Sequence, residues 1–387
     1  MEKIVRAMMD LIASEVCGKE LDRTQFQLSD EELAGLYRLS KFHDLAHLVG
    51  DALIKNDLIP EGELKAKFEK QLMMAVYRYE RINYELTQIK QTLNDAQIPF
   101  LPLKGSVLRQ YYPEPWMRTS CDIDVLVREE DLDRAVQVLT KQLAYRADVR
   151  GSHDVAFYSQ SGIHVELHYS LIESKVVGEA DKVLESVWEE STPSAEGSFC
   201  YVMPDALFYY YHIAHMAKHF QGGGCGIRPF LDIWVLNHRE NETLGDRKAL
   251  LEMGGLDAFS MASEKLSQVW FECAQGDDVT EQMERYLLGG GVYGTTENRV
   301  SVQQIKKGGK IRYALSRIWL PYDTLKFYYP RLNGKRMLLP FFEVRRWFKL
   351  LFCGGIRRST HELKVNSTIS KETQNDTKKL LDSLHLK

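Results

Sequence analysis

Two aspartates that are two residues apart, Asp122 and Asp124, have the residue type and spacing of a metal site. They lie in the run CDIDVLV, whose β-branched residues are typical of a strand, so both side chains point to the same face. Neighbouring carboxylates repel each other and lose hydration, and a bound cation offsets this cost. The pair therefore fits Mg²⁺ or Mn²⁺, which accept oxygen ligands. The alternative is an exposed acidic strand edge or turn, because a bare D-x-D is short and common.

A third carboxylate, Glu166, lies in the segment IHVELHYS. Polar residues occupy every second position there, at His164, Glu166, His168 and Ser170, and so share one strand face. If this strand adjoins the first, Glu166 completes a two-metal site with Asp122 and Asp124. In such a site one ion arrives with a nucleoside triphosphate (NTP), and the other lowers the pKa of the attacking hydroxyl. The alternative is the solvent side of an amphipathic hairpin.

The tripeptide Lys104-Gly105-Ser106 closes an apolar strand and precedes VLRQYY, which is compatible with a helix. Glycine and a small hydroxyl residue at a helix N-terminus present backbone N–H groups that bind phosphate. The G-x-x-x-x-G-K-[ST] pattern of a P-loop is absent, and a plain strand-to-helix turn is the alternative. Arg118, four residues before Asp122, is a candidate for neutralising phosphate charge, or else a surface arginine.

A group of histidines follows at helical spacing. His212, His215 and His219 share one face of a predicted helix, and Arg228 and Asp232 lie in the next helix. This spacing permits a zinc site, which would make the protein a zinc hydrolase centred on His212, His215 and Asp232. We interpret these residues as hydrogen-bonding partners within the core, with His212, His215 or His219 bonded to Asp232 or Arg228. Alternatively, the two helices form one wall of a pocket for the acceptor substrate or the nucleobase.

Other histidines have less specific surroundings. His168, beside Glu166, is a candidate hydrogen-bond donor next to the metal site or a base for the nucleophile, although strand histidines without such a role are commoner. His43 and His47 are spaced as on a helix, and we interpret them as packing or capping residues.

The elements that position these residues follow from the spacing of apolar side chains. Residues 30–55, with Ser29 and Asp30 as candidate N-caps, and residues 63–96 have apolar positions every three or four residues, which predicts helices. Residues 131–143 have the same helical pattern. Predicted strands are residues 98–105, 121–127, 154–160 and 163–170. This order, with a tight turn at Ser161-Gly162, predicts an α+β fold with a small mixed sheet and helices packed on one face.

We predict four regions along the chain. These are an N-terminal helical region 1–96, a core 97–203 that contains all three motifs, a C-terminal helical region 204–358 and a polar tail 359–387, mobile or weakly helical. The segment 310–352 is aromatic and basic. We interpret it as a buried helical lid whose Arg and Lys heads reach solvent, with nucleic acid, a membrane or a partner as alternative contacts.

Composition limits the class of protein. The chain has 387 residues and a formal net charge of −4, which argues against a large nonspecific nucleic-acid surface and favours a small-molecule or protein acceptor. Its cysteines, Cys17, Cys121, Cys200, Cys225, Cys273 and Cys353, form no C-x-x-C pair, which predicts a reduced, cytoplasmic protein without a disulfide framework. We expect no signal peptide and, without a run of 18 apolar residues, no membrane span.

Together the motifs resemble the DNA polymerase beta nucleotidyltransferase superfamily, whose pattern is a Gly-Ser at a helix start, a D-x-D and a carboxylate on a later strand. More closely, they resemble the uncharacterised nucleotidyltransferase family within it. The L-K-G, R-x-x-x-D-I-D-x-L-V and E/D-L-H elements of that family match Leu103–Gly105, Arg118–Val127 and Glu166–His168. With the helix of Asn83 and the later H-x-x-H and G-[IL]-R-x-x-x-D helices, the resemblance spans roughly residues 30–240.

The resemblance implies transfer of a nucleoside monophosphate from an NTP to a hydroxyl, phosphate or similar acceptor, with Mg²⁺ or Mn²⁺ as cofactor and pyrophosphate leaving. The implied catalytic and metal residues are Asp122, Asp124 and Glu166, and the implied nucleotide-binding residues are Lys104, Gly105, Ser106 and Arg118. Candidates for hydrogen bonding to the metal ligands or for lining the acceptor site are His168, His212, His215, Arg228 and Asp232. The alternative is a non-catalytic nucleotide-binding or regulatory, toxin-like module on the same fold.

Two positions depart from the superfamily pattern. Lys104 stands where an apolar residue is usual in the superfamily, although lysine is usual in the narrower family, where it would reach the triphosphate or pair with an acidic ligand. Glu166 stands where aspartate is more frequent. Neither change reduces the number of carboxylates, so we expect an active site.

Overall fold

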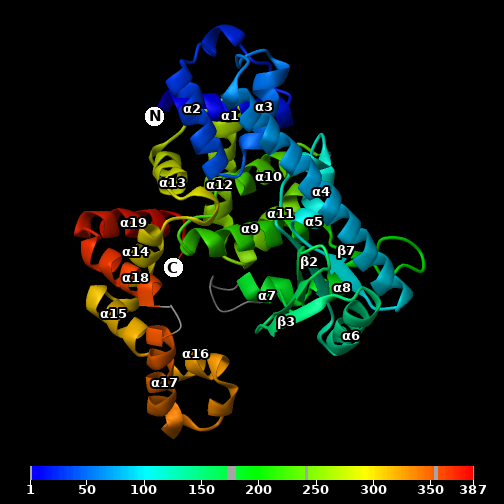
Figure 1. Ribbon diagram of the computed structural model, residues 1–387, viewed down its shortest axis with the longest axis vertical. Helices are drawn as coiled ribbons and strands as arrows, with labels where there is room; N and C mark the ends of the chain where they lie inside the picture. The colour runs from blue at the N-terminus through cyan, green and yellow to red at the C-terminus, as the bar shows by residue number, and fades with distance from the viewer. Residues whose placement is uncertain (1, 172–179, 240–242, 353–355, 387) are drawn as a thin grey trace.

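The computed structural model describes residues 2–171, 180–239, 243–352 and 356–386. The fold is α+β, as predicted, with a five-stranded mixed sheet, a two-stranded sheet and many helices (Figure 1). Cys353 lies outside the described residues, and the other five cysteines form no disulfide. No helix in the described ranges has both the length and the apolar character needed to cross a membrane.

The N-terminal region is helical. Its helices are α1 (Glu2–Val16), α2 (Asp30–Phe42), α3 (Ala46–Lys55) and the long α4 (Glu63–Asp95). The predicted cap is present, because the Ser29 side chain accepts a hydrogen bond from the Glu32 N–H and Glu32 closes a capping box. The expectation of one continuous helix over residues 30–55 is wrong, because the chain breaks between α2 and α3, where Asp44 has a φ of +55°.

The sheet has the strand order β1-β2-β5-β4-β3. Its strands are β1 (Phe100–Pro102), β2 (Asp122–Val127), β3 (Arg146–Arg150), β4 (Asp154–Tyr158) and β5 (His164–His168). The predicted parallel pairing joins β2 to β5 after α6 (Leu132–Gln142), and the predicted hairpin joins β4 to β5. β1 pairs antiparallel to β2. The edge strand β3 was missed in the sequence because RADVR is short and mostly polar.

The two faces of the sheet have different roles. Ile123, Val125 and Val165 point to one face and pack against the apolar sides of α4 and α6. Because side chains alternate along a strand, Asp122, Asp124 and Glu166 point to the opposite face. Leu101 and Leu126 on that opposite face belong to the main core, together with residues of α9 (Asp205–Gln221). The sheet therefore has one apolar face and one face that presents carboxylates toward α9.

A turn of helix, short strands and two further helices complete the core region. They are α5 (Gly105–Leu108), α7 (Ala180–Glu185), α8 (Val187–Glu190), β6 (Thr192–Pro193) and β7 (Tyr201–Val202). The helices after α9 are α10 (Arg228–Asn237), α11 (Leu244–Met253), α12 (Asp257–Phe271), α13 (Asp278–Leu288), α14 (Thr296–Lys307), α15 (Lys310–Ile318), α16 (Tyr322–Tyr328), α17 (Leu339–Phe352), α18 (Ile356–Thr368) and α19 (Lys371–Ser383).

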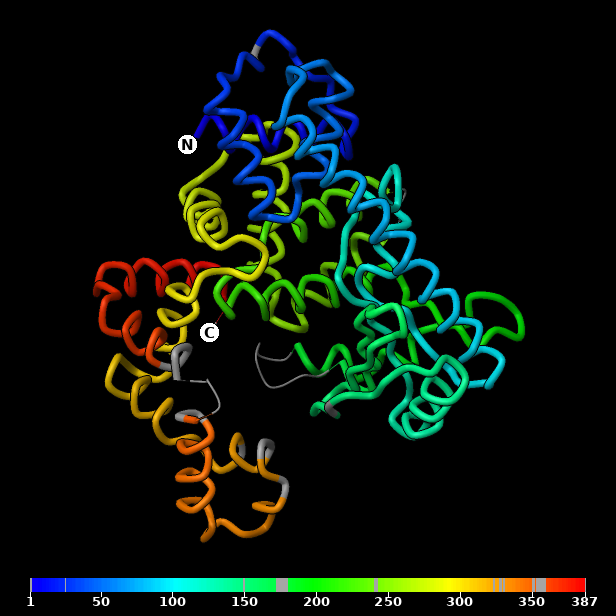
Figure 2. Tube along the Cα trace, viewed as in Figure 1, coloured from blue at the N-terminus to red at the C-terminus, as the bar shows by residue number. Residues whose placement is uncertain are grey.

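Two C-terminal expectations change. The stretch expected to be a mobile or weakly helical polar tail contains α19 and most of α18, and Leu380, Leu381 and Leu384 of this stretch are buried in the main core. The segment 310–352 is not a buried lid. Many of its large apolar side chains are exposed, and α16 and α17 project from the rest of the fold at the end opposite the N-terminal helices (Figure 2).

Candidate active site

The three predicted carboxylates meet on adjacent strands. The register of the parallel pair places Asp122 opposite His164 and Asp124 opposite Glu166. Asp124, Glu166 and His168 each offer a ligand atom, and these atoms all lie within 4.8 Å of one another. Asp124 and Glu166 are therefore brought together, and His168 joins them because it shares the polar face of β5. Asp122 lies on the same face of β2 as Asp124 but is not part of this group.

Asp124 is the most constrained of these groups. Its Oδ1 accepts hydrogen bonds from Lys104 Nζ and His168 Nε2, each at 2.9 Å. Burial would raise the pKa of Asp124, but the Lys104 charge and the His168 hydrogen bond outweigh it and hold this pKa well below its usual range. Burial would likewise lower the pKa of His168, but its bonds to Asp124 and Glu166 raise it. Asp124 is thus an ionised carboxylate held between the Lys104 ammonium group and the His168 ring.

Asp122 has the opposite electrostatic character. Burial, together with the charge of Asp124, raises the pKa of Asp122, and the charge of Lys104 does not compensate. Two carboxylates on one strand face thus repel each other, as the sequence predicts. A divalent cation between them would relieve this repulsion, so the carboxylate oxygens of Asp122, Asp124 and Glu166 fit Mg²⁺ or Mn²⁺.

Helix α9 contributes groups that face the carboxylates. Tyr211 is buried, and burial raises its pKa above the usual value. The nearby Lys104 charge opposes this rise and the Asp124 charge adds to it. Burial and then the Lys104 charge lower the pKa of Lys218 to about 8. Sequence reasoning missed Tyr211 and Lys218 because it considered only the histidines of this helix. The i, i+4, i+7 spacing of Tyr211, His215 and Lys218 is the signal that could have found them.

The alternative of a zinc centre on His212, His215 and Asp232 is not supported by the geometry of the described residues. His212 Nε2 donates to the Pro229 carbonyl at 3.0 Å, and Asp232 accepts from Tyr112 and Arg118. Among the described residues, the one group of three or more His, Cys, Asp and Glu side chains that could hold a metal is Asp124, Glu166 and His168. The adopted interpretation of His212 as a core hydrogen-bonding residue agrees with this geometry.

The histidines of the N-terminal region also pack as expected. His47 is buried and its Nε2 donates to the Met117 carbonyl at 2.9 Å, while His43 Nε2 lies 3.2 Å from the Leu288 carbonyl. Burial lowers the pKa of both side chains to about 4. Both are therefore neutral at physiological pH and tie the break between α2 and α3 to other parts of the chain.

The two predicted arginines form internal ion pairs. Arg118 is not a surface arginine, because its side chain is 11% exposed and its Nη2 and Nε donate to Asp232 at 2.9 and 3.1 Å. Arg228 Nη2 lies 2.6 Å from Asp44 Oδ2, which also accepts from Thr119 Oγ1 at 3.0 Å. These contacts connect the segment before β2 to α10 and to the N-terminal helices.

The Lys104-Gly105-Ser106 turn is tight. Lys104 has a φ of +43°, a conformation that costs energy in a residue other than glycine. The Ser106 N–H already donates to the Leu103 carbonyl at 3.0 Å, and the Ser106 hydroxyl is buried and has no hydrogen-bond partner within the described structure. α5 is only four residues long, so the phosphate cradle expected here remains a prediction.

Gly105 leaves room for Arg118. A Cβ at this position would lie 2.7 Å from Arg118 Nη1 and 3.3 Å from Ser120 Cβ, and Asp232 prevents Arg118 from moving aside. We expect Gly105→Ala to lower the free energy of unfolding by about 1–3 kcal/mol in urea titrations. Gly245→Ala is the control, because no atom lies within 4 Å of its added Cβ. Equal stability of the two variants would contradict the packing described.

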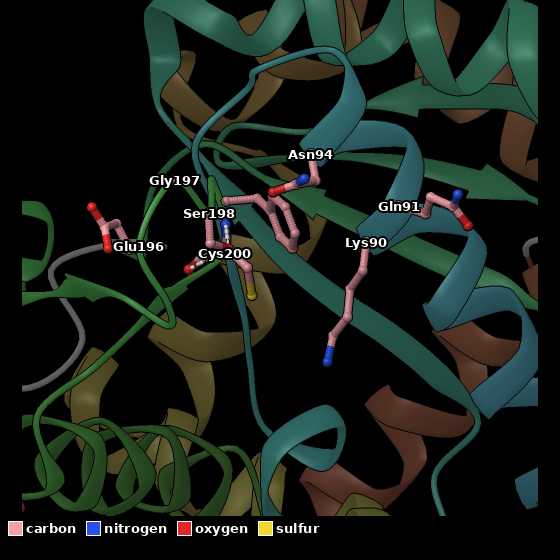
Figure 3. A pocket seen from close by; sticks show the side chains of 8 residues that line it. Lys90, Gln91, Asn94, Glu196, Gly197, Ser198 and Cys200 are labelled. Atoms are coloured by element: carbon pink, nitrogen blue, oxygen red, sulfur yellow. Dashed lines mark hydrogen bonds between the residues drawn. The ribbon is translucent and has the colours of Figure 1, made fainter.

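Two cavities adjoin the edge strand β1. One, of about 390 Å³, is lined by Lys90, Gln91 and Asn94 of α4 and by Ser198 and Cys200 (Figure 3). The other, of about 530 Å³, is lined by residues that include Ser106, Tyr111 and Arg239. Lys90 and Cys200 line both cavities. Neither cavity is lined by Asp122, Asp124 or Glu166.

The D-x-D strand, the parallel neighbour with a further carboxylate and the preceding Gly-Ser turn have the order expected from the nucleotidyltransferase resemblance. The chain belongs to the family described as "Uncharacterised nucleotidyltransferase", whose model matches residues 29–262. The resemblance seen in the sequence over roughly residues 30–240 is confirmed. No curated protein and no solved structure matches the chain.

Proposed function

We propose that this protein transfers a nucleoside monophosphate from an NTP to an acceptor, with Mg²⁺ or Mn²⁺ as cofactor and pyrophosphate as the leaving group. The observation that carries this proposal is the pairing of Asp124 with Glu166 across two parallel strands, with Asp122 on the same face. Membership of a nucleotidyltransferase family supports the reaction class. The net charge of −4 favours a small-molecule or protein acceptor over a long nucleic acid.

Asp122, Asp124 and Glu166 would hold the metal. Bound divalent ions in such sites neutralise phosphate charge and activate the attacking hydroxyl. His168 orients Asp124 through the bond to its Oδ1, which leaves the other carboxylate oxygen for a ligand. Lys104 Nζ lies 2.9 Å from Asp124 Oδ1, so its ammonium group would neutralise an NTP phosphate beside the carboxylates. Tyr211 and Lys218 of α9 would close the opposite side.

Metal binding tests the carboxylate assignment without an acceptor. We expect the protein to bind Mn²⁺ in calorimetric titrations, with tighter binding when an NTP is present, and Glu166→Gln to weaken this binding about tenfold or more because it removes a charged oxygen ligand. Glu129→Gln is the control, since Glu129 is an exposed carboxylate in the turn after β2. Unchanged Mn²⁺ affinity in Glu166→Gln would contradict the assignment.

A second candidate is a non-catalytic nucleotide-binding or regulatory, toxin-like module. It is favoured by the internal bonds of two predicted nucleotide-binding groups, the Arg118 guanidinium to Asp232 and the Ser106 N–H to Leu103. This candidate predicts NTP binding without pyrophosphate release over a broad panel of acceptors. Pyrophosphate release that depends on an acceptor would exclude it.

A further inference from the structure

The segment 310–352 has a charge unlike the rest of the chain. It contains ten Lys and Arg residues but two Asp and Glu residues, a net charge of +8, whereas the whole chain has −4. We call this segment, which includes α15, α16 and α17, the basic arm. Glu343, one of its two acidic residues, is fully buried and pairs with Arg346. The surface of the arm is therefore strongly cationic.

Helix α17 presents an apolar stripe to solvent. Phe341, Val344, Phe348 and Phe352 are spaced three or four residues apart, so they share one side of the helix, and all are exposed, Phe348 to 58% and Phe352 to 80%. The other side is covered, because Phe342 packs with residues of α16 and the following loop in a small separate core. The exposed stripe is thus not the packing face of the arm.

Helix α15 carries a second stripe that meets the first. Ile311, Leu315 and Ile318 follow an i, i+4, i+7 spacing and are exposed. At the end of α15, Trp347 Nε1 donates to the Ile318 carbonyl at 2.9 Å, and the Trp319 and Trp347 rings lie 6.4 Å apart. The two tryptophans therefore join the stripes of α15 and α17.

We propose that the basic arm binds peripherally to the surface of a bilayer that contains anionic lipid. Arg345 and Lys349 are exposed beside the stripe of α17, the arrangement of a helix that lies in a membrane interface. The charge of +8 complements anionic headgroups, and the Trp and Phe side chains suit the headgroup boundary. The arm projects away from the rest of the fold, so a flat surface can reach it (Figures 1 and 2).

Two other occupants fit less well. A second copy of the chain would bring two surfaces of charge +8 together, which like-charge repulsion opposes. Nucleic acid could pair its phosphates with the basic side chains and stack its bases on the aromatic rings. It would leave the aliphatic side chains of Ile311, Leu315 and Val344 exposed to water. Both occupants are outcomes of the test below.

The test is co-sedimentation of the full chain with vesicles of phosphatidylcholine alone or with 30% phosphatidylglycerol. We expect binding to the anionic vesicles that weakens with salt. Phe348→Ser/Phe352→Ser should weaken it about tenfold or more, and Arg345→Gln/Lys349→Gln about fivefold for each charge removed. Met73→Ser/Met74→Ser is the matched control, because these apolar side chains are exposed on α4, Met73 to 70%.

Several results would overturn the proposal. The first is that the protein does not sediment with anionic vesicles. The second is that the arm variants bind these vesicles as tightly as the parent does. The third is that the protein binds a single-stranded oligonucleotide and not the vesicles. A dimer in light scattering that Phe348→Ser/Phe352→Ser dissociates would instead assign the stripe to contact between copies. Circular dichroism establishes folding of each variant, and the charge variant provides the test if the apolar variant does not fold.

Discussion

Replacing Asp122 and Asp124 together by asparagine is expected to lower nucleotidyl transfer about a thousandfold or more. The substitution removes two charged oxygen ligands from one strand face while it preserves side-chain size. Steady-state assays of pyrophosphate release are the measurement, once an acceptor is found. Asp148→Asn is the control, because Asp148 is an exposed carboxylate on β3 of the same sheet. Retained nucleotidyl transfer in the double variant would show that these aspartates are not needed for catalysis.

The single variants should differ in stability. Because burial and the Asp124 charge raise the pKa of Asp122 in the folded state, the ionised Asp122 destabilises the fold at neutral pH, and Asp122→Asn should raise Tm. The pKa of Asp124 is lowered, so its charge stabilises the fold, and Asp124→Asn should lower Tm by leaving the Lys104 ammonium group without its counter-charge. Thermal melts at pH 7 without metal compare the two. Equal shifts would contradict the electrostatics described.

Asp232→Asn should have the largest effect on stability, about 3–5 kcal/mol. Asp232 and Arg118 are buried and share two hydrogen bonds, and the Tyr112 hydroxyl donates to the same carboxylate at 2.7 Å. The substitution leaves the Arg118 charge buried and unpaired. Urea titrations measure the change. Glu252→Gln is the control, since Glu252 pairs with Lys248 at 3.7 Å on the surface and an exposed pair contributes little.

The same ion pair predicts a pH dependence. Burial would raise the pKa of Asp232, but Arg118 lowers it below its usual range near 4. A carboxyl whose folded-state pKa is depressed contributes stability above its unfolded pKa and loses it as the pH falls through the folded value. The stability difference between the parent and Asp232→Asn should therefore shrink below pH 4. A difference that is constant down to pH 2 would mean that the Asp232 charge is not the cause.

The sheet could be predicted largely from local pattern. The strand of Asp122 and Asp124, the hairpin turned at Ser161-Gly162 and the crossover helix all follow from residue spacing. The break between α2 and α3 could not, because Asp44 is fixed by Arg228, a residue 184 positions away. Local periodicity carries no information on such a contact.

The site was predictable where one strand pattern determines it. Alternation places Asp124 and Glu166 on polar faces, and neighbouring strands then bring them together. The ion pair of Arg118 could not be predicted, since its partner Asp232 lies 114 residues away in the sequence. Tyr211 and Lys218 required knowledge of which face of α9 meets the sheet. Residues whose role depends on a distant partner need the fold before they can be assigned.

The most direct test of the central claim compares two positions of label in the NTP. The purified protein is incubated with each of the four NTPs, labelled at the α- or the γ-phosphate, with Mg²⁺ or Mn²⁺ and a cell extract that supplies acceptors. We predict that label from the α-phosphate enters an acceptor, that label from the γ-phosphate appears as pyrophosphate, and that Asp122→Asn/Asp124→Asn does neither. Transfer of the γ-label, or NTP binding without any transfer, would contradict the proposed nucleotidyltransferase activity.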